Sequence, residues 1–127
     1  MPRDPRAYLW DAQQAAGLLT EFSNGRTFTE YQADALLRSA IERQFEVVGE
    51  ALNQLSRVAP EVAALIPDLP RIVAFRNILI HGYATVDDAL VWQLLVDKLP
   101  ALRQILRTLL NDDVDQSGSG ATASPGS

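Results

Sequence analysis

Apolar residues recur three and four positions apart along most of this chain, and that spacing restricts the possible folds more than any other feature. It places side chains on one face of an α-helix, whereas the alternation typical of a half-buried β-strand does not occur. Between residues 6 and 22 the apolar face consists of Leu9, Ala12, Ala16 and Leu19. The sequence therefore predicts an all-α fold in which such faces pack on one another.

A second and longer helix is predicted after the turn residues at positions 23–25. Thr27 followed by Glu30 has the form of a capping box, in which each side chain accepts a hydrogen bond from the other residue's backbone. Apolar residues then keep helical spacing from position 33 to position 55. We expect one continuous helix over this stretch.

Prolines shape the segment that follows. Pro60, Pro67 and Pro70 bracket a short stretch that has room for one or two helical turns. Residues 71–80 contain no helix breaker, and Gly82 is suited to a helix C-terminus. The sequence predicts a kinked connector followed by a short helix that ends near residue 82.

The last predicted helix covers residues 86–109. Thr85 and Asp88 offer a cap at its start, and Pro100 should bend or interrupt it. The whole pattern predicts an antiparallel bundle of four to five helices in one domain, residues 1–110. Residues 111–127 are acidic and then rich in Gly and Ser, so we expect a disordered tail.

Composition restricts the function. With no cysteine and one histidine, a single chain has neither a thiolate nucleophile nor a Cys/His metal site. The net charge of −5 disfavours a broad nucleic-acid-binding face, although three of the acids lie in the tail, and a local cationic site remains possible. We expect neither a leader nor a membrane-spanning segment, and therefore a cytoplasmic protein without a membrane or DNA partner.

The octapeptide RNILIHGY, residues 76–83, concentrates the chemically useful side chains. On an ideal helix Arg76 and Tyr83 point within about 20° of each other, whereas His81 is turned by about 140° from Arg76. We expect Gly82 to let the chain leave helical geometry, so that the imidazole swings toward the guanidinium. The helix dipole at that end favours a protonated imidazole.

Arginine and histidine without grouped carboxylates indicate metal-free phosphodiester chemistry that needs no cofactor. Arg76 can form paired hydrogen bonds to a phosphate, and His81 can take a proton from a ribose 2′-hydroxyl or give one to the leaving 5′-oxygen. Because acid and base roles need two groups and the chain has one histidine, we expect a two-fold dimer with both motifs at one cleft.

The motif resembles the Arg-x4-His-x-Tyr signature of HepT-like ribonuclease toxins of the HEPN superfamily. The polar Asn77 after the arginine fits that family, as do GRTF at 25–28, GEAL at 49–52 and VDDALVWQLLVDKLP at 86–100. The similarity covers about residues 7–110. It implies a HEPN-like helical homodimer that cleaves RNA, with Arg76 and His81 as catalytic residues. The acidic charge balance also fits a toxin with a narrow target, such as transfer RNA, better than a general degrader.

The resemblance also implies a role in a toxin–antitoxin pair of type VII. The partner would be a nucleotidyltransferase antitoxin that transfers AMP to the motif tyrosine, Tyr83. An anionic adduct beside Arg76 would occupy the phosphate site and repel RNA.

The sequence alone allows other interpretations. His81 could only cap a helix, Tyr83 could only pack, and Glu50 either orients Arg76 or faces solvent. The chain could also be a non-catalytic substrate-binding or regulatory subunit of a nucleotidyltransferase, or a purely structural dimerisation bundle.

Overall fold

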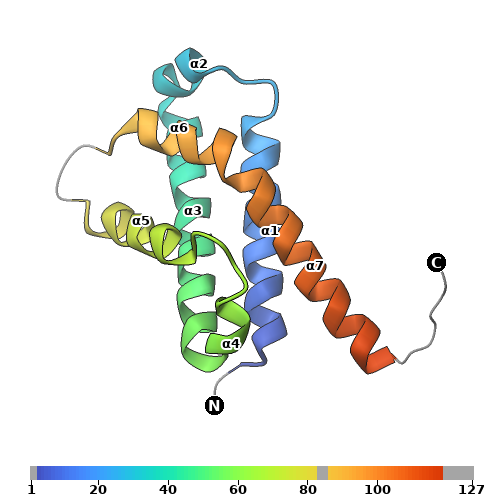
Figure 1. The fold of residues 1–127 in the computed structure, drawn as a ribbon. Coiled ribbons are helices and arrows are strands. Elements are labelled where there is room, and N and C mark those ends of the chain that lie inside the picture. Colours follow the sequence, from blue (N-terminus) through green and yellow to red (C-terminus); the bar gives the residue numbers. More distant parts are fainter. Residues whose placement is uncertain (1–2, 83–85, 119–127) are drawn as a thin grey trace.

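Helices form all the regular secondary structure in the part of the chain that the structure describes. The structure is a computed structural model that describes residues 3–82 and 86–118, with side chains as far as residue 111. The helices are α1 (Pro5–Ser23), α2 (Phe28–Ala33), α3 (Ala35–Val58), α4 (Pro60–Ala63), α5 (Leu69–His81), α6 (Asp88–Asp97) and α7 (Leu99–Gly118) (Figure 1). The predicted all-α fold is confirmed.

The antiparallel pair α1 and α3 forms the centre of the fold (Figure 1). The Asp4 side chain starts α1 by accepting a hydrogen bond from the backbone N–H of Arg6 at 2.8 Å, and Pro5 opens the first turn. Gly25, at a positive φ of 74°, then reverses the chain. Helix α7 packs on α1, and α5 crosses α3.

The prediction of one continuous helix after Thr27 is wrong, because the helix is interrupted at Asp34. The capping box is present as predicted, with Glu30 N–H donating to Thr27 Oγ1 and Thr27 N–H donating to Glu30 Oε1. It starts only the short helix α2. Asp34 then takes an extended conformation, φ −113° and ψ 100°, and its side chain accepts a hydrogen bond from Leu37 N–H at 3.0 Å. This second N-cap starts α3 in a new direction.

One apolar core runs through the bundle between α1, α3, α5 and α7. Its fully buried aliphatic side chains come mainly from α1, α3 and α7, and include Leu9, Leu19, Ile41, Leu52 and Leu106. Burying such aliphatic side chains stabilises the fold by about 1.5–3 kcal/mol each. At the end of the bundle where α2 meets α6, the rings of Tyr31 and Trp92 pack at a tilt of 36°, with their centroids 5.4 Å apart.

The proline-bracketed connector contains one short helix, as predicted. Pro60 begins α4, and the chain then turns through Asp68, which has a positive φ of 63°. Pro70 stands in the first turn of α5, where its missing N–H costs no hydrogen bond. Gly82 ends α5 in the left-handed conformation, φ 54° and ψ 29°, also as predicted.

The final helical stretch is divided in two. Asp87 caps α6 by accepting hydrogen bonds from Ala89 and Leu90 N–H, a role that we had expected of Thr85 and Asp88; Thr85 lies outside the described residues. Pro100 lies in the first turn of α7, so the interruption falls at Lys98, two residues before it.

Helix α7 continues past the expected domain boundary at residue 110 and ends at Gly118. Its backbone therefore stays helical through the acidic residues 112, 113 and 115. Among the described helices, none combines the length and the apolar character that crossing a bilayer requires.

Candidate active site

Helix α5 carries the motif and packs on the core through its apolar residues, while the chemically useful side chains stay outside the core. Ile72, Phe75 and Leu79 are buried, and Phe75 meets Phe45 of α3 edge to face at a centroid distance of 5.3 Å. Arg76 is half-buried at the edge of this contact, and Asn77 is exposed. The packing of α5 on α3 thus presents Arg76 toward the polar side of α3.

Gly49 of α3 is what lets Arg76 lie so close to that helix. A Cβ atom added at Gly49 would lie 2.3 Å from Arg76 Cβ and 2.8 Å from Arg76 Cγ, both far inside van der Waals contact. Because Gly49 is itself buried, the new atom would have no open space to enter. Gly49 therefore sets the closest approach of α5 to α3 at the position of the motif arginine.

The guanidinium of Arg76 is held by two oxygen acceptors. Nη2 donates to Glu50 Oε1 in an ion pair, and Nη1 donates to Asn77 Oδ1 at 2.7 Å. Gln54 supports the carboxylate, since its Nε2 donates to Glu50 Oε2 at 3.1 Å. Of the two interpretations of Glu50, the structure therefore agrees with the one in which its carboxylate contacts Arg76. Each Nη retains a second hydrogen for another anion.

His81 is exposed and is the last residue of α5. Helical geometry holds through His81, and Gly82 redirects the chain only after it. The chain therefore leaves helical geometry one residue too late to turn the His81 imidazole toward Arg76 as expected. The Cβ directions of Arg76 and His81 remain about 140° apart on the helix. Tyr83 lies outside the described residues.

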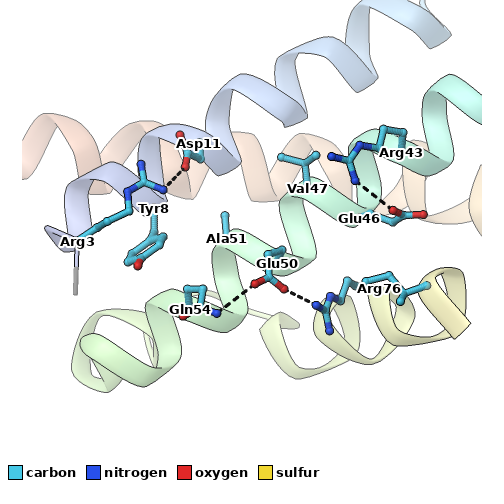
Figure 2. A pocket seen from close by; sticks show the side chains of 11 residues that line it. Arg3, Tyr8, Asp11, Arg43, Glu46, Val47, Glu50, Ala51, Gln54 and Arg76 are labelled. Carbon is cyan, nitrogen blue, oxygen red and sulfur yellow. Dashed lines mark hydrogen bonds and ion pairs between the residues drawn. The ribbon is translucent and has the colours of Figure 1, made fainter. Parts of the chain in front are cut away.

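A groove of about 440 Å³ opens beside Arg76, between the first half of α1, the polar face of α3 and the end of α5. Figure 2 shows Arg76, Glu50 and Gln54 at its lower side, joined by their hydrogen bonds. Ile80, the residue before His81, also lines it. The groove gives an anion access to the guanidinium from the solvent side.

Sequence reasoning missed Gly49 as a site residue. A glycine within a long helix costs about 0.5–1 kcal/mol relative to alanine, and its presence there signals a close approach of backbone or ligand. That signal was available in GEAL at 49–52, but it does not say what approaches. In the described part of the chain, no three His, Cys, Asp or Glu side chains group in the way that metal ligands do.

Comparison with known proteins places the sequence in a family. Residues 12–109 match the family described as ribonuclease HepT-like. A candidate RNase of Methanocaldococcus jannaschii is 29% identical over 104 residues, which are 80% of this chain and 93% of that protein. A candidate RNase of Caldanaerobacter subterraneus subsp. tengcongensis is 28% identical over 111 residues, or 87% and 98% of the two chains.

A third relative, from Thermococcus cleftensis, bears the name of a probable ribonuclease HepT. It is 29% identical over 105 residues, which are 81% of this chain and 93% of that protein. No solved structure matches the chain. Because the family match covers most of the sequence and includes Arg76 and His81, this chain belongs to the HepT-like ribonuclease family of the HEPN superfamily.

Proposed function

We propose that the chain is a metal-independent endoribonuclease in which Arg76 binds the scissile phosphate and His81 transfers a proton. The observation that carries the proposal is the placement of Arg76, which Gly49 admits and Glu50 holds at the edge of an open groove. Membership of a ribonuclease family supports RNA as the substrate. An arginine so held keeps its fork geometry ready for a phosphate and loses little entropy on binding.

The reaction would begin with attack of the ribose 2′-oxygen on phosphorus. A neutral imidazole accepts the 2′-hydroxyl proton, the bond from phosphorus to the 5′-oxygen breaks, and a protonated imidazole supplies the proton of the new 5′-hydroxyl. Arg76 stabilises the charge that develops on the phosphate oxygens. The products are a 2′,3′-cyclic phosphate and a free 5′-hydroxyl.

This scheme uses two imidazoles, and each chain has one histidine. A two-fold dimer would supply the second. Ile78, three residues before His81 and outside the groove, is 55% exposed. Apolar side chains exposed beside a functional group are typical of a surface that a partner covers. Asn77, whose Oδ1 accepts a hydrogen bond from Arg76 Nη1, would keep the guanidinium in its present orientation when the second copy binds.

Incubation of the purified protein with RNA in EDTA tests the proposal. We expect cleavage with 2′,3′-cyclic phosphate ends, and no cleavage of a substrate with a 2′-deoxy residue at the scissile position. His81→Ala should abolish the reaction. Cleavage that requires a divalent cation, or that proceeds on the deoxy substrate, would overturn this mechanism.

We further propose that the protein is the toxin of a pair and that a nucleotidyltransferase silences it by adding AMP to Tyr83. Intact mass after co-expression with a neighbouring nucleotidyltransferase should rise by one or more AMP units that map to Tyr83, with loss of cleavage. An unmodified, inert wild type that binds the nucleotidyltransferase would instead favour a regulatory subunit.

A further inference from the structure

Three of the chain's arginines line the groove beside the motif, and each meets a carboxylate there. Besides Arg76 with Glu50, Arg43 Nη1 lies 3.3 Å from Glu46 Oε1, and Arg3 Nη1 lies 2.8 Å from an oxygen of Asp11 (Figure 2). We infer that Arg43 and Arg3 bind the phosphates of the RNA strand on either side of the scissile one. This inference rests on the proposed ribonuclease function for its substrate.

The polar face of α3 forms the floor of this track. Arg43, Glu46, Glu50 and Gln54 follow one another at spacings of three, four and four, which places them on one side of the helix. Eleven residues of α-helix extend about 16 Å. In a stacked strand the phosphates follow at about 3.4 Å along the axis, so the face is long enough for several nucleotides.

Arg76 lies between the two other arginines along this face. Its Cβ is next to Gly49, six residues after Arg43 on α3 and therefore about 9 Å further along the axis. At the opposite end, Arg3 lies over the ring of Tyr8, with its guanidinium carbon 4.9 Å from the ring centroid. Figure 2 shows Arg43 and Arg3 well separated on the two sides of Glu50.

The ion pairs of Arg43 and Arg3 can be exchanged for phosphate at little cost. The Arg43 and Arg3 side chains are 69% and 52% exposed. Solvent-exposed ion pairs contribute about 0–1 kcal/mol, whereas an arginine makes shorter, paired hydrogen bonds to a phosphate. The carboxylates would hold the guanidinium groups in position until the RNA phosphates replace the carboxylates as hydrogen-bond acceptors.

The same carboxylates explain how a chain of net charge −5 can act on RNA. Three acids balance three arginines in the groove, so no broad positive field attracts nucleic acid in general. A strand gains three phosphate contacts only when it lies along the track. The arrangement predicts moderate, salt-dependent affinity for single-stranded RNA.

The test measures binding of a fluorescent single-stranded RNA to the full-length protein in a His81→Ala background, where the RNA is not cut. Arg43→Ala should weaken affinity about tenfold, the effect of losing one charge-assisted contact. It should also make the slope of log affinity against log salt shallower by about 0.7. Glu46→Gln should strengthen binding, because it removes the competitor for Arg43.

Two controls change the same charges outside the groove. Arg107→Ala removes an exposed cation of α7, and Glu61→Gln removes an exposed acid of α4. Neither should change affinity by as much as its counterpart in the groove. Equal effects of Arg43→Ala and Arg107→Ala would mean that only net charge matters, and would overturn the track.

Failure of the track and failure of the nuclease are separable. If the wild type cleaves RNA and Arg43→Ala binds as its parent does, the track is wrong and the nuclease stands. If the wild type never cleaves but RNA affinity depends on Arg43, the track stands and the nuclease is wrong. If Arg43→Ala changes the molar mass in solution instead of RNA affinity, the groove is an interface between copies, and the inference is overturned.

Discussion

Substituting Gly49 tests how the fold places the motif arginine. In Gly49→Ala the new Cβ would meet Arg76 Cβ at 2.3 Å, whereas carbon atoms pack at about 3.5–4.0 Å. Helices α3 and α5 must therefore separate locally by about 1 Å or more, and overpacking of this kind costs about 1–3 kcal/mol. Alanine's better helix propensity returns about 0.5–1 kcal/mol. We expect a net loss of free energy of unfolding.

Gly17→Ala is the matched control. Gly17 also lies inside a long helix, α1, but its added Cβ would meet only the Arg103 side chain at 3.9 Å, an ordinary contact. This variant should gain about 0.5–1 kcal/mol from helix propensity alone. Urea denaturation of both variants should thus give changes of opposite sign.

The same variant should lose activity in excess of its loss of stability. A displacement of about 1 Å at a catalytic group can lower a rate by about 100-fold, so cleavage by Gly49→Ala should be impaired at temperatures where it is fully folded. Removing Arg76 Cβ with Arg76→Gly should relieve the clash, and Gly49→Ala added to that background should stabilise the protein. A Gly49→Ala protein that is stabilised and fully active would refute the close-approach argument.

Three further substitutions have expected outcomes. Glu50→Ala, in which the contact to Arg76 is lost, should slow cleavage about tenfold while changing stability by less than about 1 kcal/mol, because the carboxylate is 46% exposed; an unchanged rate would leave Glu50 without a positioning role. The Tyr31 hydroxyl is buried without a hydrogen-bond partner among the described residues, so Tyr31→Phe should raise the free energy of unfolding by about 1 kcal/mol, and a loss would mean that the hydroxyl is bonded after all. Burial, and then repulsion from Asp88, raises the pKa of Glu42, so that between its unfolded and folded pKa the native state binds more protons and stability falls as pH rises. Glu42→Gln should therefore stabilise the protein at pH 7 by urea denaturation, with the gain vanishing below about pH 4, where both states are protonated; a gain that persists in acid would argue against this cause.

Local rules predicted much of the fold because they depend on neighbours in sequence. The Thr27 capping box and the Gly82 C-terminus of α5 both appear where they were expected. The break at Asp34 was missed because Ala33 and Leu37 are four positions apart, so helical spacing continues across it. The overlooked signal was Asp34 itself, because aspartate is a preferred N-cap residue. Its side chain accepts a hydrogen bond from the N–H of Leu37, three residues later.

The site was predictable only in part. Spacing within the motif singled out Arg76 and His81 as candidates. Contacts between residues far apart in the sequence, such as Arg76 with Glu50 26 positions before it, depend on how α5 crosses α3. Periodicity does not give that crossing. The same holds for Gly49 and for Arg43, which acquire a role only when α1, α3 and α5 enclose the groove.

Single-turnover cleavage at saturating RNA tests most directly whether the Arg76 guanidinium acts on the phosphate. Arg76→Ala should slow the chemical step about 100-fold or more, as loss of one preorganised donor to a developing charge does. Arg71→Ala, which removes an exposed arginine from the same helix outside this groove, should cleave as the wild type does. A folded Arg76→Ala protein that cleaves RNA at the wild-type rate would contradict the account.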